Sequence, residues 1–241
     1  MGVVALSLDE YPINMFTGLI ETTGTLLAVT PTEGATRITI ASPTLTSRLN
    51  TGDSIAVNGV CLTALSIEPN AFPPRFSADL AAETIARTTL SHLRPDAILN
   101  LELPTPAGSP LGGHVVQGHV DGTGTLLSLA PITPSAPKTS DWRLRLRIPD
   151  SLTRYVVPQG SITIEGISLT VAKLGRLRDV FTCAVAVIPH TVEMTNLGSL
   201  KPGDPVNLEA DLIAKYVEKM MMKDKSQPSS ITAEELVRQG F

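Results

Sequence analysis

The sequence has little cysteine, no cluster of basic residues and no long apolar run. Its two cysteines, Cys61 and Cys183, are too few for a disulfide framework and lack the spacing of metal ligands. We expect two free thiols, which suit a reducing, cytoplasmic compartment. The net charge is −4, and nucleic acid selects clustered Lys and Arg, so no nucleic-acid partner is expected. No apolar run reaches the roughly 20 residues that span a bilayer, so no membrane association is expected.

Motifs for cofactors and for acyl transfer are also missing. Residues 118–124, GHVDGTG, lack both the Rossmann frame and the Lys of a phosphate-binding loop. The chain has no G-x-S-x-G elbow, so acyl transfer is unsupported. His114 and His119 are five residues apart and would point to opposite faces of a strand, with no third ligand at useful spacing. We therefore expect no cofactor and no metal.

The first residues do not resemble the rest of the chain. Residues 1–14 have no positively charged start, and acidic residues follow their short apolar stretch, so they make a poor signal peptide. We treat 1–14 as an N-terminal extension and expect the fold to begin near Met15.

An internal repeat organises the chain from there to about residue 210. Residues 18–31 and 118–131 share an identical TGTLL core, and 57–64 and 164–171 share the frame G-x-x-L-T. A third pair, 83–103 and 190–210, shares T-x-x-x-T-x-L-x-x-L-x-P followed by N-L-E. Three matches in the same order, at offsets of 100 to 107 residues, indicate two copies of one unit.

Each copy is expected to be all-β. Residues 36–42 (TRITIAS) and 142–148 (WRLRLRI) alternate polar and apolar side chains, the period of a half-buried strand. Residues 54–65 and 161–172 each indicate two strands with a Gly between them. Several short strands in about 95 residues favour a small barrel or sandwich.

The tail after residue 210 changes to helical spacing. Residues 211–222 place Leu212 and Tyr216 on one helical face, and 231–241 follow a good cap at Ser230. Both segments predict amphipathic helices. The pattern leaves open whether they pack on their own barrel or join subunits.

Differences between the copies point to chemistry. The G-x-x-L-T frame carries Cys61 in the first copy and Ser168 in the second, while Leu19 stands opposite His119. A His and a Ser within reach of each other can move a proton. A satisfied structural histidine and a turn serine are the alternatives.

Five segments together resemble the riboflavin synthase family. They are MFTGLIE (15–21), TGDSIAVNGVCLT (51–63), GGHVVQGHVDGTG (112–124), EGISLTV (165–171) and the stretch 188–219. They occur in the family's order, and the resemblance covers about residues 15 to 220. It implies an N-terminal lumazine-binding barrel (15–111), a C-terminal lumazine-binding barrel (112–210) and a helical tail for oligomerisation (211–241). The expected fold is thus all-β, two tandem homologous six-stranded Greek-key barrels plus a C-terminal α-helix.

The resemblance also implies a reaction without cofactor. Two molecules of 6,7-dimethyl-8-ribityllumazine exchange a four-carbon unit and give riboflavin and 5-amino-6-(D-ribitylamino)uracil. Catalytic roles carry over to His119, Ser168, Cys61 and Thr170. Substrate contacts carry over to Phe16, Thr17, Ser54, Thr63, Thr84, Glu165, Ile188 and Thr191. Gln159 and Glu165 depart from the family's usual Lys and Asp, and TTLSHLRPDA in the first copy departs from its usual TNLG.

The family further implies a homotrimer whose sites lie between the N-terminal barrel of one chain and the C-terminal barrel of the next. The main alternative is a non-catalytic lumazine- or flavin-binding protein of the same fold. His119, Ser168 and Thr170 are all present here, which favours the enzyme. A purely structural double barrel would not explain the asymmetric Cys and His positions, and a flavin reductase would need a further nicotinamide domain.

Overall fold

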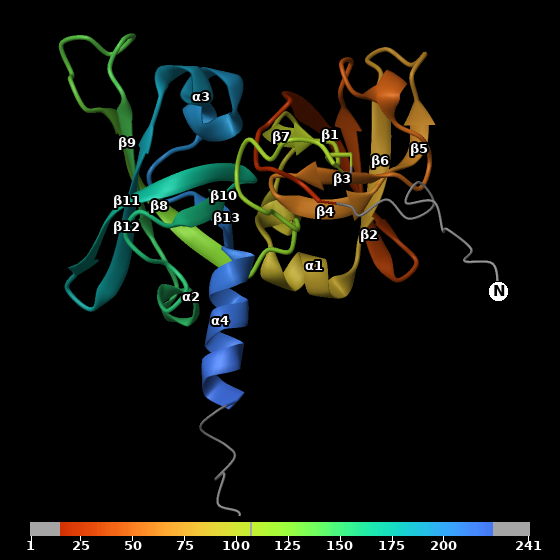
Figure 1. The fold of residues 1–241 in the computed structure, drawn as a ribbon. Coiled ribbons are helices and arrows are strands. Elements are labelled where there is room, and N and C mark those ends of the chain that lie inside the picture. The colour runs from red at the N-terminus through yellow and green to blue at the C-terminus, as the bar shows by residue number, and fades with distance from the viewer. Residues whose placement is uncertain (1–14, 107, 224–241) are drawn as a thin grey trace, which may run out of the picture.

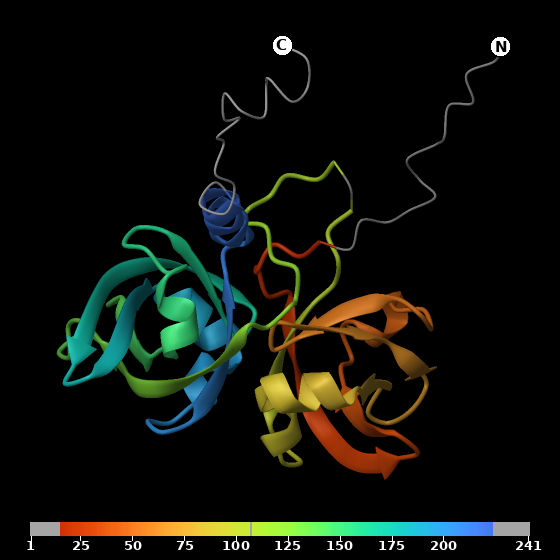
Figure 2. The same ribbon diagram turned by 90° about the horizontal axis from the view of Figure 1, so that it is seen from below.

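The computed structural model describes residues 15–106 and 108–223, which form two barrels lying side by side (Figures 1 and 2). The extension 1–14 and the helix expected over 231–241 lie outside these residues. A single chain segment between Glu102 and Gly122 connects the barrels. The two-copy architecture expected from the repeat is confirmed.

The first barrel is a seven-stranded sheet in the order β4-β3-β7-β1-β2-β6-β5. Its strands are β1 (Thr22–Thr32), β2 (Ala35–Ala41), β3 (Ser54–Val57), β4 (Val60–Thr63), β5 (Leu65–Glu68), β6 (Arg75–Leu80) and β7 (Ile98–Glu102). Helix α1 (Ala82–Arg87) and the 3-10 turns η2 (Thr46–Arg48) and η3 (Thr89–His92) complete it.

The second barrel is closed and six-stranded, in the order β10-β11-β12-β9-β8-β13. Its strands are β8 (Gly122–Pro131), β9 (Trp142–Arg147), β10 (Ser161–Ile164), β11 (Ile167–Leu177), β12 (Val180–Val187) and β13 (Pro205–Ala210). Helices α2 (Asp150–Thr153) and α3 (Pro189–Met194) and the turn η4 (Asn196–Ser199) lie between strands.

The seventh strand of the first barrel comes from a break in one strand. Strands β4 and β5, at opposite ends of the sheet order, are separated by Ala64 alone, and together they occupy the position of β11. Ser66, inside β5, has φ 44°, a left-handed conformation, and the pairing of β5 with β6 shifts register between Leu65 and Glu68. The prediction of six strands therefore holds in the second barrel, and in the first one strand is split in two.

The cores follow the alternation seen in the sequence. On β9, Leu144 and Leu146 are fully buried, whereas Arg143, Arg145 and Arg147 are exposed. Each barrel encloses its own apolar cluster. The residues that alternate with these core positions therefore face outward, where they are available to a ligand.

Helix α4 (Leu212–Lys223) confirms the helix expected over 211–222 and extends away from the barrels (Figure 1). Ion pairs Lys215–Asp121, at 2.6 Å, and Arg154–Glu218, at 3.2 Å, attach it to the second barrel. Its apolar side chains are largely exposed in the single chain: Ile213, Tyr216, Val217, Met220, Met221 and Met222.

Candidate functional site

Each barrel presents an equivalent outward face on one strand hairpin. In the first barrel, β3 and β4 pair with Ser54 opposite Thr63 and Ala56 opposite Cys61. The residues between them, such as Ile55 and Leu62, enter the core. Ser54, Cys61 and Thr63 therefore share one face, because side chains alternate along a strand.

The second barrel repeats this arrangement with other residue types. Strands β10 and β11 pair with Ser161 opposite Thr170 and Thr163 opposite Ser168. The predicted Ser168 and Thr170 thus lie on one outward face with two further hydroxyls. The two repeats keep the same frame, and the thiol of Cys61 is replaced by a hydroxyl in the second.

Two short segments cross between the barrels and reach these faces. Phe16 and Val116 exchange both backbone hydrogen bonds, N–H to carbonyl, at 2.9 and 3.1 Å. Beyond this pair, the Ser168 amide donates to the Gly18 carbonyl at 2.8 Å, and the Cys61 amide donates to the Gly118 carbonyl at 2.9 Å. The start of each repeat therefore lies against the hairpin of the other barrel.

A buried glutamate anchors each crossing segment. Glu102 accepts hydrogen bonds from the Thr17 and Gly18 amides and from the Thr17 hydroxyl. Glu209 accepts from the amides of residues 117, 118 and 119. Burial raises the pKa of each carboxyl to about 7, although these amide donors act in the opposite direction. The shared N-L-E motif thus positions the segments that carry Thr17 and His119.

A hydrogen-bonded chain holds Ser168. Its hydroxyl is 2.7 Å from His114 Nδ1, and His114 Nε2 is 3.0 Å from the Thr163 hydroxyl. Burial lowers the pKa of His114, which favours a neutral ring that donates at one nitrogen and accepts at the other. The neighbouring Gly113 leaves no room for a side chain, because a Cβ there would overlap the Thr17 carbonyl oxygen.

The histidine in contact with Ser168 is thus His114, whereas His119 follows Gly118 beside Cys61. His119 is exposed in the single chain and its amide is bound to Glu209 at 3.1 Å. From the sequence, His114 was rejected as a metal ligand and placed opposite Asn14 of the first repeat, but its contact with Ser168 was not predicted. Its position in GGHVVQGH was visible, but its partner lies 54 residues away on another element.

The thiol of Cys61 is held in its protonated form. Burial raises its pKa, the Ser54 hydroxyl contact opposes this, and the charge of Glu209 adds to it. Cys61 also contacts the small cluster of Phe16, Ala56 and Val116 between the barrels. Phe16 is itself fully buried there, and Thr17 is 6% exposed. Both residues therefore support the outward faces from the interior and do not lie on them.

Equivalent helices border the two faces. Thr84 lies in α1, directly after β6, and Thr191 lies in α3, directly after β12. Both side chains are half-buried, and Ile188, which precedes α3, is 55% exposed. Strand β12 pairs with β11, so Ile188 and Thr191 follow the strand next to the one that carries Ser168 and Thr170.

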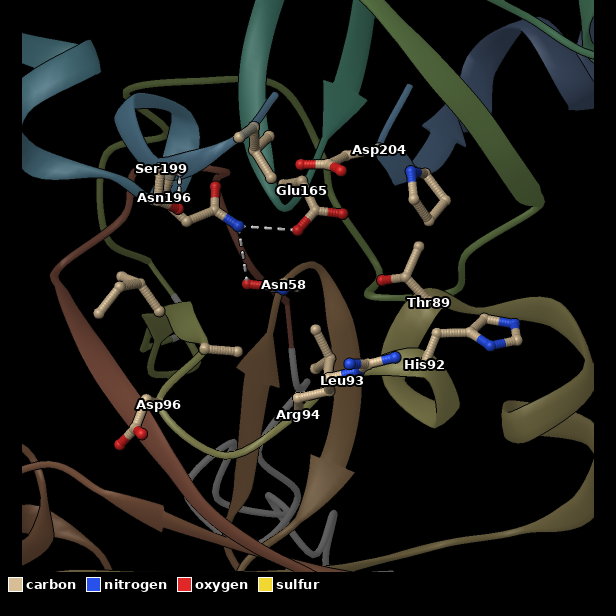
Figure 3. A pocket seen from close by; sticks show the side chains of 14 residues that line it. Asn58, Thr89, His92, Leu93, Arg94, Asp96, Glu165, Asn196, Ser199 and Asp204 are labelled. Atoms are coloured by element: carbon tan, nitrogen blue, oxygen red, sulfur yellow. Dashed lines mark hydrogen bonds between the residues drawn. The ribbon is translucent and has the colours of Figure 1, made fainter. Parts of the chain in front are cut away.

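Glu165 lies elsewhere, in the seam between the barrels (Figure 3). It is 2% exposed and accepts hydrogen bonds from the Asn207 amide at 2.6 Å and the Asn196 side chain at 2.8 Å. Burial raises its pKa to about 7, against the effect of these two donors. The sequence grouped Glu165 with the substrate contacts, and the structure places it away from both outward faces.

Metal clusters and membrane-spanning helices are both missing from the described part of the chain. Residues 15–106 and 108–223 contain no group of three or more His, Cys, Asp or Glu side chains placed to hold a metal ion. In the same ranges, no helix is both long and apolar enough to cross a membrane.

Comparison with known proteins assigns both copies to one domain type. The model of the lumazine binding domain matches residues 17–104 and 117–211. Riboflavin synthase of Mycobacterium tuberculosis is 47% identical over 209 residues, covering 86% of this chain and 98% of that protein. Riboflavin synthase of Actinobacillus pleuropneumoniae is 40% identical over 229 residues, covering 94% of this chain and all of its own length.

A solved structure shares the fold at lower identity. LumP complexed with riboflavin superposes with a TM-score of 0.68 at 23% identity, over 81% of this chain and 99% of LumP. At that identity the likeness concerns the fold alone. The family follows from the two domain matches and from the relatives that align over nearly their whole length: this chain belongs to the riboflavin synthase family of tandem lumazine binding domains.

Proposed function

We propose that this chain catalyses the dismutation of two 6,7-dimethyl-8-ribityllumazine molecules to riboflavin and 5-amino-6-(D-ribitylamino)uracil. A four-carbon unit leaves one lumazine, which becomes the pyrimidinedione, and joins the other, which becomes riboflavin. The reaction needs no oxidant or reductant from outside, because the two substrate molecules exchange the unit between themselves. The observation that carries the proposal is the pair of equivalent hydroxyl- and thiol-bearing faces, which suits two identical substrates.

The two faces receive different tasks in this proposal. On the second barrel, Ser168 and Thr170 bind the ring whose methyl group loses a proton, with Ile188 and Thr191 along its edge. On the first barrel, Ser54, Cys61, Thr63 and Thr84 hold the other ring. Holding two rings in reacting geometry and assisting proton transfer supply the rate enhancement.

The placement of His119 gives a reason for a homotrimer. Within one chain, His119 lies beside the Cys61 face, and Ser168 lies on the other barrel. We propose that the first face of one subunit opposes the second face of the next, so that His119 and Ser168 share a site. The exposed apolar side chains of α4 are available to hold the subunits together.

Phe16 and Thr17 support the second face through the crossing segment rather than by direct reaction. For Glu165, we propose that its contribution to substrate binding is indirect, because its carboxylate is bound to Asn196 and Asn207 in the seam. We also propose a cytoplasmic location, since both cysteines are free thiols.

The test follows riboflavin absorbance after 6,7-dimethyl-8-ribityllumazine is added to purified protein without cofactor or metal. We expect two lumazines consumed for each riboflavin formed. Ser168→Ala and His119→Ala should each lower kcat by about 10²–10⁴-fold, the range of a lost proton-transfer group. Ser128→Ala, on β8 of the same barrel, is the matched control and should retain activity.

A second candidate function is non-catalytic lumazine or flavin binding, which the fold likeness to ligand-bound LumP favours. Stoichiometric binding of lumazine without riboflavin formation would favour that function over the enzyme.

A further inference from the structure

A cavity of about 400 Å³ lies in the seam between the barrels, apart from both outward faces. Its inner end is formed by Asn58, Thr89, Glu165 and Asn196, and Figure 3 shows these side chains around a common space. The rest of the lining is half apolar and half polar or charged: Leu93, Ala97, Ile98, Leu200 and Pro205, with His92, Arg94, Asp96, Ser199 and Asp204. The volume is in the range of small-molecule sites, roughly 300–1,000 Å³.

The hydrogen bonds at the seam break the symmetry of the repeat. The Asn196 side-chain amide donates to Glu165 at 2.8 Å and to Asn58 at 3.3 Å. In the first repeat, the position equivalent to Asn196 holds Thr89, just as Asn58 is equivalent to Glu165. Thr89 is shorter, and only its backbone amide joins the network, donating to the Asn207 side chain at 2.8 Å.

The Thr89 hydroxyl is left without a partner. Thr89 is 4% exposed, and among the described residues nothing donates to or accepts from its Oγ1. A buried hydroxyl without a hydrogen bond is costly, so native structures normally supply a partner. Figure 3 shows this oxygen pointing toward Asn58 and Glu165, into the cavity. The missing partner therefore belongs to whatever occupies this space.

The groups around the space define the chemistry of an occupant. Asn58 accepts at its oxygen from Asn100 and Asn196, and in the described ranges its amide nitrogen has no acceptor. This nitrogen can donate to a carbonyl, the Glu165 carboxylate can accept from an N–H, and the Thr89 hydroxyl can do either. A carbonyl beside an N–H satisfies all three groups, and the apolar part of the lining suits the faces of a flat ring.

We propose that this cavity binds a planar heterocycle through a cyclic-amide edge, the class to which pyrimidinediones belong. The physiological identity of the ligand rests on the proposed function, since one product of that reaction is a pyrimidinedione. The cavity then gives the protein a product site separate from the outward faces. The recognition chemistry itself depends only on the seam residues.

The test uses uracil as the probe, with 1,3-dimethyluracil as the matched ligand that keeps the ring and lacks the N–H groups. Binding is measured by calorimetry on the full-length protein at pH 8, and by NMR of the Asn58 and Asn196 side-chain amides. We expect uracil to bind and to shift both amide signals, and 1,3-dimethyluracil to bind at least tenfold more weakly.

Thr89→Asn introduces the residue that the second repeat already has at this position. It should complete the network, fill the space and weaken uracil binding at least tenfold, whereas Thr30→Asn, on the exposed end of β1, should leave binding unchanged. Thr89→Val tests the hydroxyl alone and should weaken binding with little change in volume.

Two results would overturn the site. One is the absence of uracil binding at millimolar concentration, and the other is full binding to Thr89→Asn, which would locate uracil elsewhere, for example on an outward face. Lumazine conversion is measured on the same preparations. Uracil binding at the seam without conversion would refute the proposed function alone, and conversion without seam binding would refute the cavity proposal alone.

Discussion

The contact between two glycines at the seam predicts a large effect of a single methyl group. Gly59 and Gly166 occupy equivalent hairpin turns, with φ of 76° and 83°. A Cβ on Gly59 would lie 2.7 Å from the Gly166 nitrogen and 2.8 Å from its Cα. Both atoms are backbone, so the clash is relieved only if the barrels move apart. Gly59→Ala therefore tests directly how closely the barrels must approach.

Two costs contribute to the expected loss of stability. A side chain in the left-handed region costs about 1–2 kcal/mol. Overpacking a close contact adds typically about 1–3 kcal/mol. We expect Gly59→Ala to lower the free energy of unfolding by about 2–5 kcal/mol, with part of the loss coming from the stretched asparagine network around Asn58.

Gly52→Ala separates the backbone cost from the contact cost. Gly52 has φ 99°, and among the described residues, its two chain neighbours aside, no atom lies within 4 Å of its Cβ position. The equivalent residue, Gln159, already carries a side chain at φ 64°. Gly52→Ala should therefore lower the free energy of unfolding only by the cost of the left-handed backbone, about 1–2 kcal/mol. Urea unfolding followed by circular dichroism and by the fluorescence of Trp142, the only tryptophan, measures both variants. Equal losses, within about 0.5 kcal/mol, would refute a close contact between the turns.

Three further predictions concern single side chains. The folded pKa of Glu165, about 7, lies above its unfolded value of 4.5, so its contribution to stability is present below pH 4.5 and is lost as the pH rises to 7. Glu165→Gln should therefore gain about 2–3 kcal/mol relative to wild type between pH 5 and pH 8 in urea unfolding, and no relative change would contradict the burial effect. His114→Ala should lower kcat at least tenfold with little change in KM, because the Ser168 hydroxyl loses its partner; unchanged turnover would remove His114 from the mechanism. Cys61 should react slowly with iodoacetamide at pH 7 and faster above pH 9, followed by peptide mass spectrometry, because burial raises its pKa; rapid alkylation at pH 7 would contradict this.

Local patterns predicted the strands and the repeat, because alternation along a strand fixes which side chains face out. The shared outward face of Ser168 and Thr170 follows from that alternation and from the pairing of one hairpin. The break at Ala64 could not be predicted, since residues 60–68 look as continuous as their counterpart in β11. Neither this break nor the left-handed conformation of Ser66 inside β5 has a glycine or proline signal in the sequence.

Contacts between barrels were beyond sequence reasoning for a physical reason. The burial of Glu165 depends on how two folded units meet, and the partnership of His114 with Ser168 depends on where the segment before β8 lies against the second barrel. The repeat aligns Glu165 with Asn58, which identifies the two as equivalent positions. The alternation of side chains, however, describes only how a residue is oriented within its own hairpin. It contains no information on which surface of the unit faces a second copy.

The crossing segments have a consequence for how the chain is assembled. Each repeat sends its first residues against the hairpin of the other barrel and receives the same from it, through the reciprocal Phe16–Val116 pair. This is the geometry of a domain-swapped homodimer in which the two partners have been joined end to end. The association of the two barrels is intramolecular, so it forms at the effective concentration that the connecting segment sets and does not depend on the concentration of the protein. Because both repeats belong to one chain, each can carry its own side chain at an equivalent position, as Cys61 and Ser168 do.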